Sequence, residues 1–300
     1  MPKMYRWIAG FLIVGIITTV IAHYFKVHPL AVFDSKGVVA SKERGLIIFA
    51  LLLSLIVILP VFGMLFAFAW KYRASNKQAK YSPELGGSRV AETIWWLIPS
   101  CLILILSIVT WNSSHALDPY RPLNTTVKPL VIQVVALDWK WLFIYPQAQV
   151  ATVNYVEFPV NQPVTFEITA DAPMNSLWIP QLAGQVYAMP GMITELHVQA
   201  SQIGDYRGSS ANISGKGFAG MKFTARADSA AHYTAWLKRV QQSSNNLNIT
   251  TYDNLARPSI NNAVVYYGHA EADVFDTTVM KFMMPMTNSG KALEDPVVTQ

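Results

Sequence analysis

Cysteine is almost absent from this 300-residue sequence, and histidine is sparse. Cys101 is the single cysteine and lies inside an apolar run. The chain can therefore form no internal disulfide, and a metal site made of several cysteines is excluded. No two histidines have the spacing of metal ligands on a helix or strand, so the sequence predicts no bound metal. The histidines are His23, His28, His115, His197, His232 and His269.

Charge is also scarce, since only 14% of the residues are charged and 52% are hydrophobic. A typical soluble domain has about 25% charged residues, so the composition indicates that part of the chain contacts lipid. The net charge of +5 arises in residues 1–129, which contain 13 Lys and Arg against 5 Asp and Glu. Because these cations flank apolar segments, we interpret them as topology signals and expect no nucleic acid partner.

The first apolar segment, residues 1–22, has the pattern of a secretory signal. Lys3 and Arg6 precede an apolar stretch, and small residues near Ala22 offer an acceptable cleavage sequence. No cysteine follows, so lipid attachment at a processed N-terminus is not available. We favour a signal peptide, and an uncleaved membrane anchor is the alternative.

Residues 45–111 predict a transmembrane hairpin. Residues 45–70 and 93–111 are apolar and long enough to cross a bilayer core of about 30 Å, because a helix rises about 1.5 Å per residue. Pro60 and Pro99 lie inside these segments and should kink them. The connecting loop is rich in Lys and Arg, so the positive-inside rule places it in the cytoplasm and the chain after Trp111 in the periplasm.

From residue 129 onward the sequence changes to short runs with alternating polarity, separated by Pro, Gly and Asn. Such runs predict a β-sandwich or barrel over residues 129–228. The last segment, residues 229–300, starts with an amphipathic helix that Asp228 or Ser229 caps. The rest of this segment is a tail in which the sequence patterns of helices and strands are weaker. The clearest runs are residues 131–135, 164–169, 193–198 and 221–227.

Four strings of residues resemble the haem–copper oxidase subunit II family in order and spacing. They are VAETIWWLIP at 90–99, DWKW at 138–141, APMNSLWIP at 172–180 and YRGSSANISG at 206–215. The resemblance covers roughly residues 35–285. It implies two transmembrane helices followed by a periplasmic cupredoxin-like β-sandwich, in a multi-pass protein of the bacterial inner membrane.

Of the copper-ligand positions of this family, only the methionine is kept, as Met221. Cytochrome c oxidases carry two bridging thiolates, a Glu, a His and a Met in the loop, and a second His on the preceding strand. Here serine stands at both thiolate positions, asparagine at the Glu and strand His positions, and phenylalanine at the loop His position. A serine hydroxyl is not deprotonated near neutral pH, so it cannot bridge two coppers. The positions are Asn175, Ser210, Asn212, Ser214, Phe218 and Met221.

With these replacements, the chain resembles the quinol-oxidase branch of the family, the cytochrome bo-type ubiquinol oxidases. The resemblance implies a subunit with no cofactor and no catalytic residue of its own. Haems, copper and the oxidation of ubiquinol are then expected in subunit I. Subunit I and smaller membrane subunits are the expected partners, and cytochrome c is not.

The resemblance also assigns roles outside the copper positions. Glu92 matches a carboxylate at the mouth of a proton pathway, although an acid at a helix N-terminus can also be purely structural. Asp138, Trp139 and Trp141 are candidates for the interface with subunit I. Two alternatives remain open: a membrane-anchored β-sandwich that acts as a binding or sensing module, and subunit II of a cytochrome c oxidase.

Overall fold

The computed structural model describes residues 12, 15–20, 23–27, 30–78, 87–123 and 125–283. Most of the signal-like segment 1–22 lies outside these ranges. The chain divides into two compact units, residues 42–121 and residues 1–41 with 122–300, and each is described by itself.

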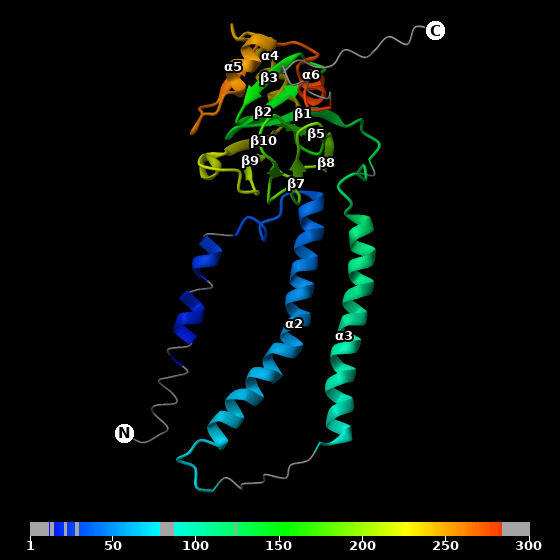
Figure 1. The fold of residues 1–300 in the computed structure, drawn as a ribbon, viewed down its shortest axis with the longest axis vertical. Coiled ribbons are helices and arrows are strands. Elements are labelled where there is room, and N and C mark those ends of the chain that lie inside the picture. Colours follow the sequence, from blue (N-terminus) through cyan, green and yellow to red (C-terminus); the bar gives the residue numbers. More distant parts are fainter. Residues whose placement is uncertain are drawn as a thin grey trace, which may run out of the picture. The chain divides into compact units, whose positions relative to one another are not determined.

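The smaller unit is built from two long apolar helices, α2 (Val38–Lys71) and α3 (Arg89–Ala116) (Figure 1). Both are long and apolar enough to cross a membrane by length and composition. Figure 1 shows that α2 is bent, and Pro60 explains a bend because its ring removes one backbone hydrogen bond of the helix. The apolar side chains of both helices are exposed in the isolated chain, as lipid-facing or subunit-facing surfaces are.

The larger unit contains two main β-sheets, which are described here in spatial order. Apart from the parallel pairs β1–β5 and β4–β10, neighbouring strands in these sheets are antiparallel. The six-stranded sheet runs β12 (Val265–Tyr267), β3 (Val150–Val153), β2 (Lys140–Tyr145), β1 (Leu130–Leu137), β5 (Val164–Ala170) and β8 (Thr194–Val198). The five-stranded sheet runs β4 (Tyr155–Pro159), β10 (Lys222–Asp228), β9 (Gly204–Ser210), β6 (Asn175–Trp178) and β7 (Val186–Ala188).

The six-stranded sheet buries side chains on both faces. On β1 and β2, Val134 and Phe143 belong to the main core between the sheets, whereas Val135 and Leu142 belong to a second cluster. A sheet that is buried on both faces needs nearly continuous apolar strands. This explains why the sequences VIQVVAL and WLFIY show little alternation of polar and apolar residues.

Residues 229–283 complete this second cluster. Helix α4 (Ala230–Gln241) is capped by Ser229, as expected, and α5 (Ile249–Ala256) and α6 (Val274–Met280) follow. Tyr252, Phe275 and Val279 from α5 and α6 pack in the second cluster, and β12 pairs with β3. The short strands β11 (Asn246–Leu247) and β13 (His269–Ala270) form a separate parallel pair. The segment with weaker sequence signals is therefore folded onto the sheet.

Gly208 on β9 provides a sharp test of core packing. A Cβ atom at this position would lie 2.1 Å from the ring of Phe223, whereas a Cβ atom at Gly204 on the same strand would meet nothing closer than 3.8 Å. Phe223 packs against Phe143 in the core. We expect Gly208→Ala to lower the free energy of unfolding by about 1–3 kcal/mol, as overpacking does. Chemical unfolding followed by near-UV circular dichroism measures this, and an equal effect of the control Gly204→Ala would contradict it.

Candidate functional site

The loop that follows β9 contains most of the positions that resemble copper ligands. It extends from Ser210, the last residue of β9, to Met221, and includes the short helix η1 (Phe218–Gly220). Asn175 joins it from β6, because β6 pairs with β9. The structure therefore brings all six positions into one region at the end of the five-stranded sheet. We call this segment, residues 210–221, the β9–β10 loop.

Hydrogen bonds between neutral groups engage Ser210, Asn212 and Asn175, whereas the buried hydroxyl of Ser214 has no hydrogen-bond partner among the described residues. The Ser210 hydroxyl donates to Asn175 Oδ1 over 2.9 Å, and its oxygen lies 3.2 Å from the backbone carbonyl of Asn212. The Asn212 amide donates to the carbonyl of Met174 over 2.8 Å, and the Asn175 amide donates to the carbonyl of Pro173 over 2.7 Å. Ser210 and Asn175 are buried. These side chains hold β6 and the loop together.

The apolar positions of the loop differ in depth. Met221 is buried in the main core, and its backbone N–H donates to the carbonyl of Phe218. Phe218 starts η1 and is half-buried. Met221 therefore packs as a core side chain, the use that methionine commonly has.

Trp139 is held by a turn rather than by a strand. Asp138 and Trp139 form the turn between β1 and β2, and Trp139 has a φ of 62°. This turn directs the indole onto the β9–β10 loop, where its Nε1–H donates to the carbonyl of Ser214 over 3.3 Å. A Cβ atom on Gly217 would lie 2.4 Å from the Trp139 ring. Glycine is required there because the ring occupies that space.

Trp141 does not reach the surface. It lies on β2 with no exposed area and packs against Phe223 in the main core. It therefore offers no surface to a partner, and the interface hypothesis for this stretch rests on Asp138 and Trp139, which are both half-buried.

Lys140 is a buried residue that the sequence did not single out. Its Nζ donates to the carbonyl of Arg257 over 2.8 Å and to the hydroxyl of Ser259 over 2.5 Å. Burial lowers the pKa of Lys140, and the nearby Asp138 opposes that shift. These bonds fix the loop after α5 against β2. The position of a lysine between apolar residues of a strand could have indicated that Lys140 is buried. It could not have identified Arg257, the hydrogen-bond partner 117 residues away.

The donor set of the β9–β10 loop does not fit a dinuclear copper centre. Such a centre needs thiolate bridges and imidazole ligands, whereas the loop offers hydroxyl and amide groups, and the Ser210 hydroxyl is already hydrogen-bonded. Within the described ranges, no three His, Cys, Asp or Glu side chains gather as a metal site would require. Cys101 lies on α3, in the other unit.

Glu92 lies in the other unit, in the first turn of α3. Ser88 caps this helix, because its hydroxyl accepts from the N–H of Ala91 over 3.4 Å. Glu92 is exposed, and a Cβ atom on Gly87 would lie 2.7 Å from its carboxylate. A carboxylate near a helix N-terminus is stabilised by the helix dipole.

The fold and the copper-free loop define the class of protein. Residues 142–227 match the family described as cytochrome c oxidase subunit II, periplasmic domain, and residues 241–286 match the COX aromatic rich motif. Two apolar helices followed by a cupredoxin-like β-domain confirm the expected fold class. The chain is thus an inner-membrane protein with a periplasmic β-domain.

Relatives identify the branch of this class. The chain is 50% identical to cytochrome bo(3) ubiquinol oxidase subunit 2 of Pseudomonas putida over 83% of its own length and 79% of the relative. It is 49% identical to the protein of that name from Pseudomonas aeruginosa, over 84% and 76%. It is 45% identical to ubiquinol oxidase subunit 2 of Acetobacter aceti, over 88% of both chains. The chain belongs to the ubiquinol oxidase subunit 2 family.

The donor set predicts how the chain responds to copper. We expect the purified protein, incubated with copper and then desalted, to retain no dinuclear centre by elemental analysis and electron paramagnetic resonance. A stoichiometric dinuclear signal from the native chain would contradict the assignment. The matched variant restores the ligand types through Asn175→His, Ser210→Cys, Asn212→Glu, Ser214→Cys and Phe218→His, and it should gain copper if the loop keeps its backbone.

Proposed function

We propose that this chain is subunit II of a proton-pumping cytochrome bo-type ubiquinol oxidase and has no catalytic centre of its own. The observation that carries the proposal is a β9–β10 loop closed by Ser210, Asn175 and Asn212 in a chain with 50% identity to a ubiquinol oxidase subunit 2. Electrons need no copper relay in this subunit if ubiquinol delivers them directly to subunit I. Haems, copper and oxygen reduction then belong to subunit I, and no cytochrome c partner is needed.

We further propose that the protein is multi-pass, with residues 45–111 as the hairpin and the β-domain, residues 129–228, in the periplasm. The cations Lys71, Arg73 and Lys77 support a cytoplasmic position for the loop between α2 and α3. We propose that residues 229–300 form a C-terminal helix and tail, of which residues 229–283 are described and extend the β-domain, and that residues 1–22 are a signal. Subunit I and smaller membrane subunits cover the exposed apolar helices in this arrangement.

One face of α3 is suited to contact subunit I. At about 100° per residue, Ser100, Ser107, Thr110 and Ser114 all lie within about 80° of Glu92 around the helix. Small and hydroxyl-bearing residues are typical of helix–helix interfaces in membranes, because they permit close approach and hydrogen bonding. We propose that this face meets subunit I, and that Asp138 and Trp139 contribute on the periplasmic side.

Glu92 lies at the end of this face, where α3 would enter the membrane from the cytoplasm. The helix N-terminus stabilises negative charge at this position, and water at the lipid headgroups would reach it. We propose that Glu92 collects protons at the entrance of a pathway into subunit I. Ionisable groups at membrane helices are functional candidates for this reason.

Co-purification tests the assignment. We expect the chain, tagged and isolated from its own membranes in mild detergent, to bring with it a multi-span protein that contains haem and oxidises ubiquinol. Added reduced cytochrome c should not be oxidised by this complex. Isolation of the chain without a haem protein would favour the binding or sensing alternative, and oxidation of cytochrome c would favour a cytochrome c oxidase.

The proton role makes a separate prediction. We expect Glu92→Gln to slow ubiquinol oxidation several-fold in the assembled complex without loss of haem, because the entrance loses its titratable group. Glu92→Asp should retain more activity, since it keeps the acid. Asp118→Asn, which removes a carboxylate beyond the opposite end of α3, is the matched control and should leave turnover unchanged. Normal turnover of Glu92→Gln over a wide pH range would exclude the role.

A further inference from the structure

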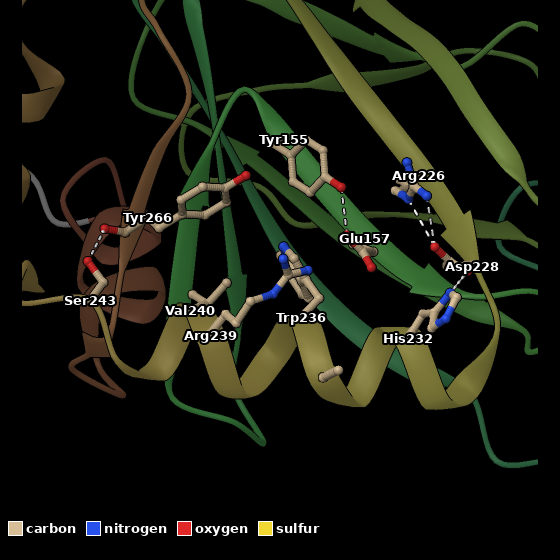
Figure 2. Close-up of a pocket in the computed structure, with 11 residues that line it drawn as sticks. Tyr155, Glu157, Arg226, Asp228, His232, Trp236, Arg239, Val240, Ser243 and Tyr266 are labelled. Carbon is tan, nitrogen blue, oxygen red and sulfur yellow. Dashed lines mark hydrogen bonds and ion pairs between the residues drawn. The ribbon is translucent and has the colours of Figure 1, made fainter.

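A pocket of ≈ 670 Å³ lies between α4 and the edge of the five-stranded sheet, and it shares no residue with the β9–β10 loop (Figure 2). Its volume is within the range of small-molecule sites. Tyr155 and Glu157 face it from β4, Arg226 from β10, Arg239 from α4 and Tyr266 from β12. Aromatic rings and charges of both signs therefore meet in one cavity.

Glu157 is a buried carboxylate that forms no ion pair with any described residue. It is 3% exposed, and one of its oxygens accepts a hydrogen bond from the Tyr155 hydroxyl over 2.6 Å. Arg226 stands directly opposite on β10, but its guanidinium binds Asp228 at 3.0 Å and Asp205 at 3.3 Å instead. Burial raises the pKa of Glu157. A buried carboxylate is costly unless it is paired, so this group is suited to accept from a cationic ligand.

Arg239 supplies the opposite charge. It lies in the last turn of α4 and lines the same pocket, and its guanidinium makes no ion pair or hydrogen bond with the described residues. Figure 2 shows its side chain reaching from α4 toward the strands that carry Tyr155 and Glu157. A free guanidinium offers a planar fork of donors that matches phosphate or carboxylate oxygens.

The charges restrict the class of ligand. A simple anion on Arg239 would also face the carboxylates of Glu157 and Asp228, and a simple cation at Glu157 would also face Arg226 and Arg239. A ligand that carries both charges on a short linker avoids both penalties. The rings of Tyr155 and Tyr266, whose centroids are 6.0 Å apart and nearly perpendicular, add faces that attract an ammonium group.

We propose that this pocket binds a small zwitterion in which a short linker joins an ammonium group to a phosphate. The ammonium group would lie at Glu157 and the tyrosine rings, and the phosphate at Arg239. The same chemistry occurs in soluble phosphoethanolamine and in the headgroup of phosphatidylethanolamine. Neither source bears on the oxidase assignment, because the pocket is separate from the β9–β10 loop and from Glu92.

Calorimetric titration of the full-length chain in detergent tests the proposal, with O-phosphoethanolamine as the probe. We expect saturable binding, and binding weaker by about tenfold or more for ethanolamine or inorganic phosphate alone, since each engages one charge. Arg239→Ala and Glu157→Gln should each weaken binding by a similar factor. Lys238→Ala, which removes a neighbouring cation of α4 that does not line the pocket, is the matched control and should bind normally.

Several results would overturn the proposal. They are the absence of saturable binding, equal binding of phosphate alone, and equal affinities of Arg239→Ala and Lys238→Ala. Arg239 is exposed, so its variant should keep the native unfolding temperature even if Glu157→Gln does not fold. The same titration in nanodiscs identifies the source of the ligand. Weaker binding of O-phosphoethanolamine in nanodiscs of phosphatidylethanolamine than in nanodiscs of phosphatidylglycerol indicates that the lipid headgroup competes for the pocket. Equal binding in the two kinds of nanodisc indicates the soluble compound.

Discussion

Burial of both faces of the six-stranded sheet is the constraint on which the β-domain depends. The inner faces of β1 and β2 form the main core, and their outer faces form the second cluster with α5 and α6. Without residues 249–279, Val135, Leu142 and Ile144 would be exposed to water, at a cost of roughly 1.5–3 kcal/mol for each fully buried side chain. The C-terminal segment is therefore part of the domain, in keeping with its match to the aromatic rich motif.

The same rigid sheet positions the β9–β10 loop. Trp139 is directed onto Gly215 and Gly217 by a left-handed turn between two core strands, and Asn175 reaches Ser210 because β6 and β9 are paired. Hydrogen bonds between neutral groups hold the loop where a copper-binding relative would use metal bonds. Each such bond contributes only about 0.5–1.5 kcal/mol, so the loop relies on the surrounding strands to keep its form.

The two units meet different requirements. The β-domain buries two apolar clusters of its own, whereas α2 and α3 leave most of their apolar side chains exposed and need lipid or protein to cover them. The pocket beside α4 is a third kind of surface, because Glu157 and the guanidinium of Arg239 form no ion pair among the described residues. The strand register places Arg226 opposite Glu157, but Asp228 and Asp205 occupy the guanidinium of Arg226.

The sequence by itself determined the two apolar helices, the strands over residues 131–135, 164–169, 193–198 and 221–227, and the start of α4 after Asp228 or Ser229, because each depends on neighbouring residues. It also determined the loss of copper ligands, since residue types alone decide that Ser210 and Ser214 cannot bridge metals. Only the tertiary structure decided that Trp139 turns while Trp141 is buried, and that Lys140 holds a loop more than a hundred residues away. It likewise brought Glu157 and Arg239 to one pocket. Such pairings depend on strand register and helix packing, which bring together residues that no local pattern connects.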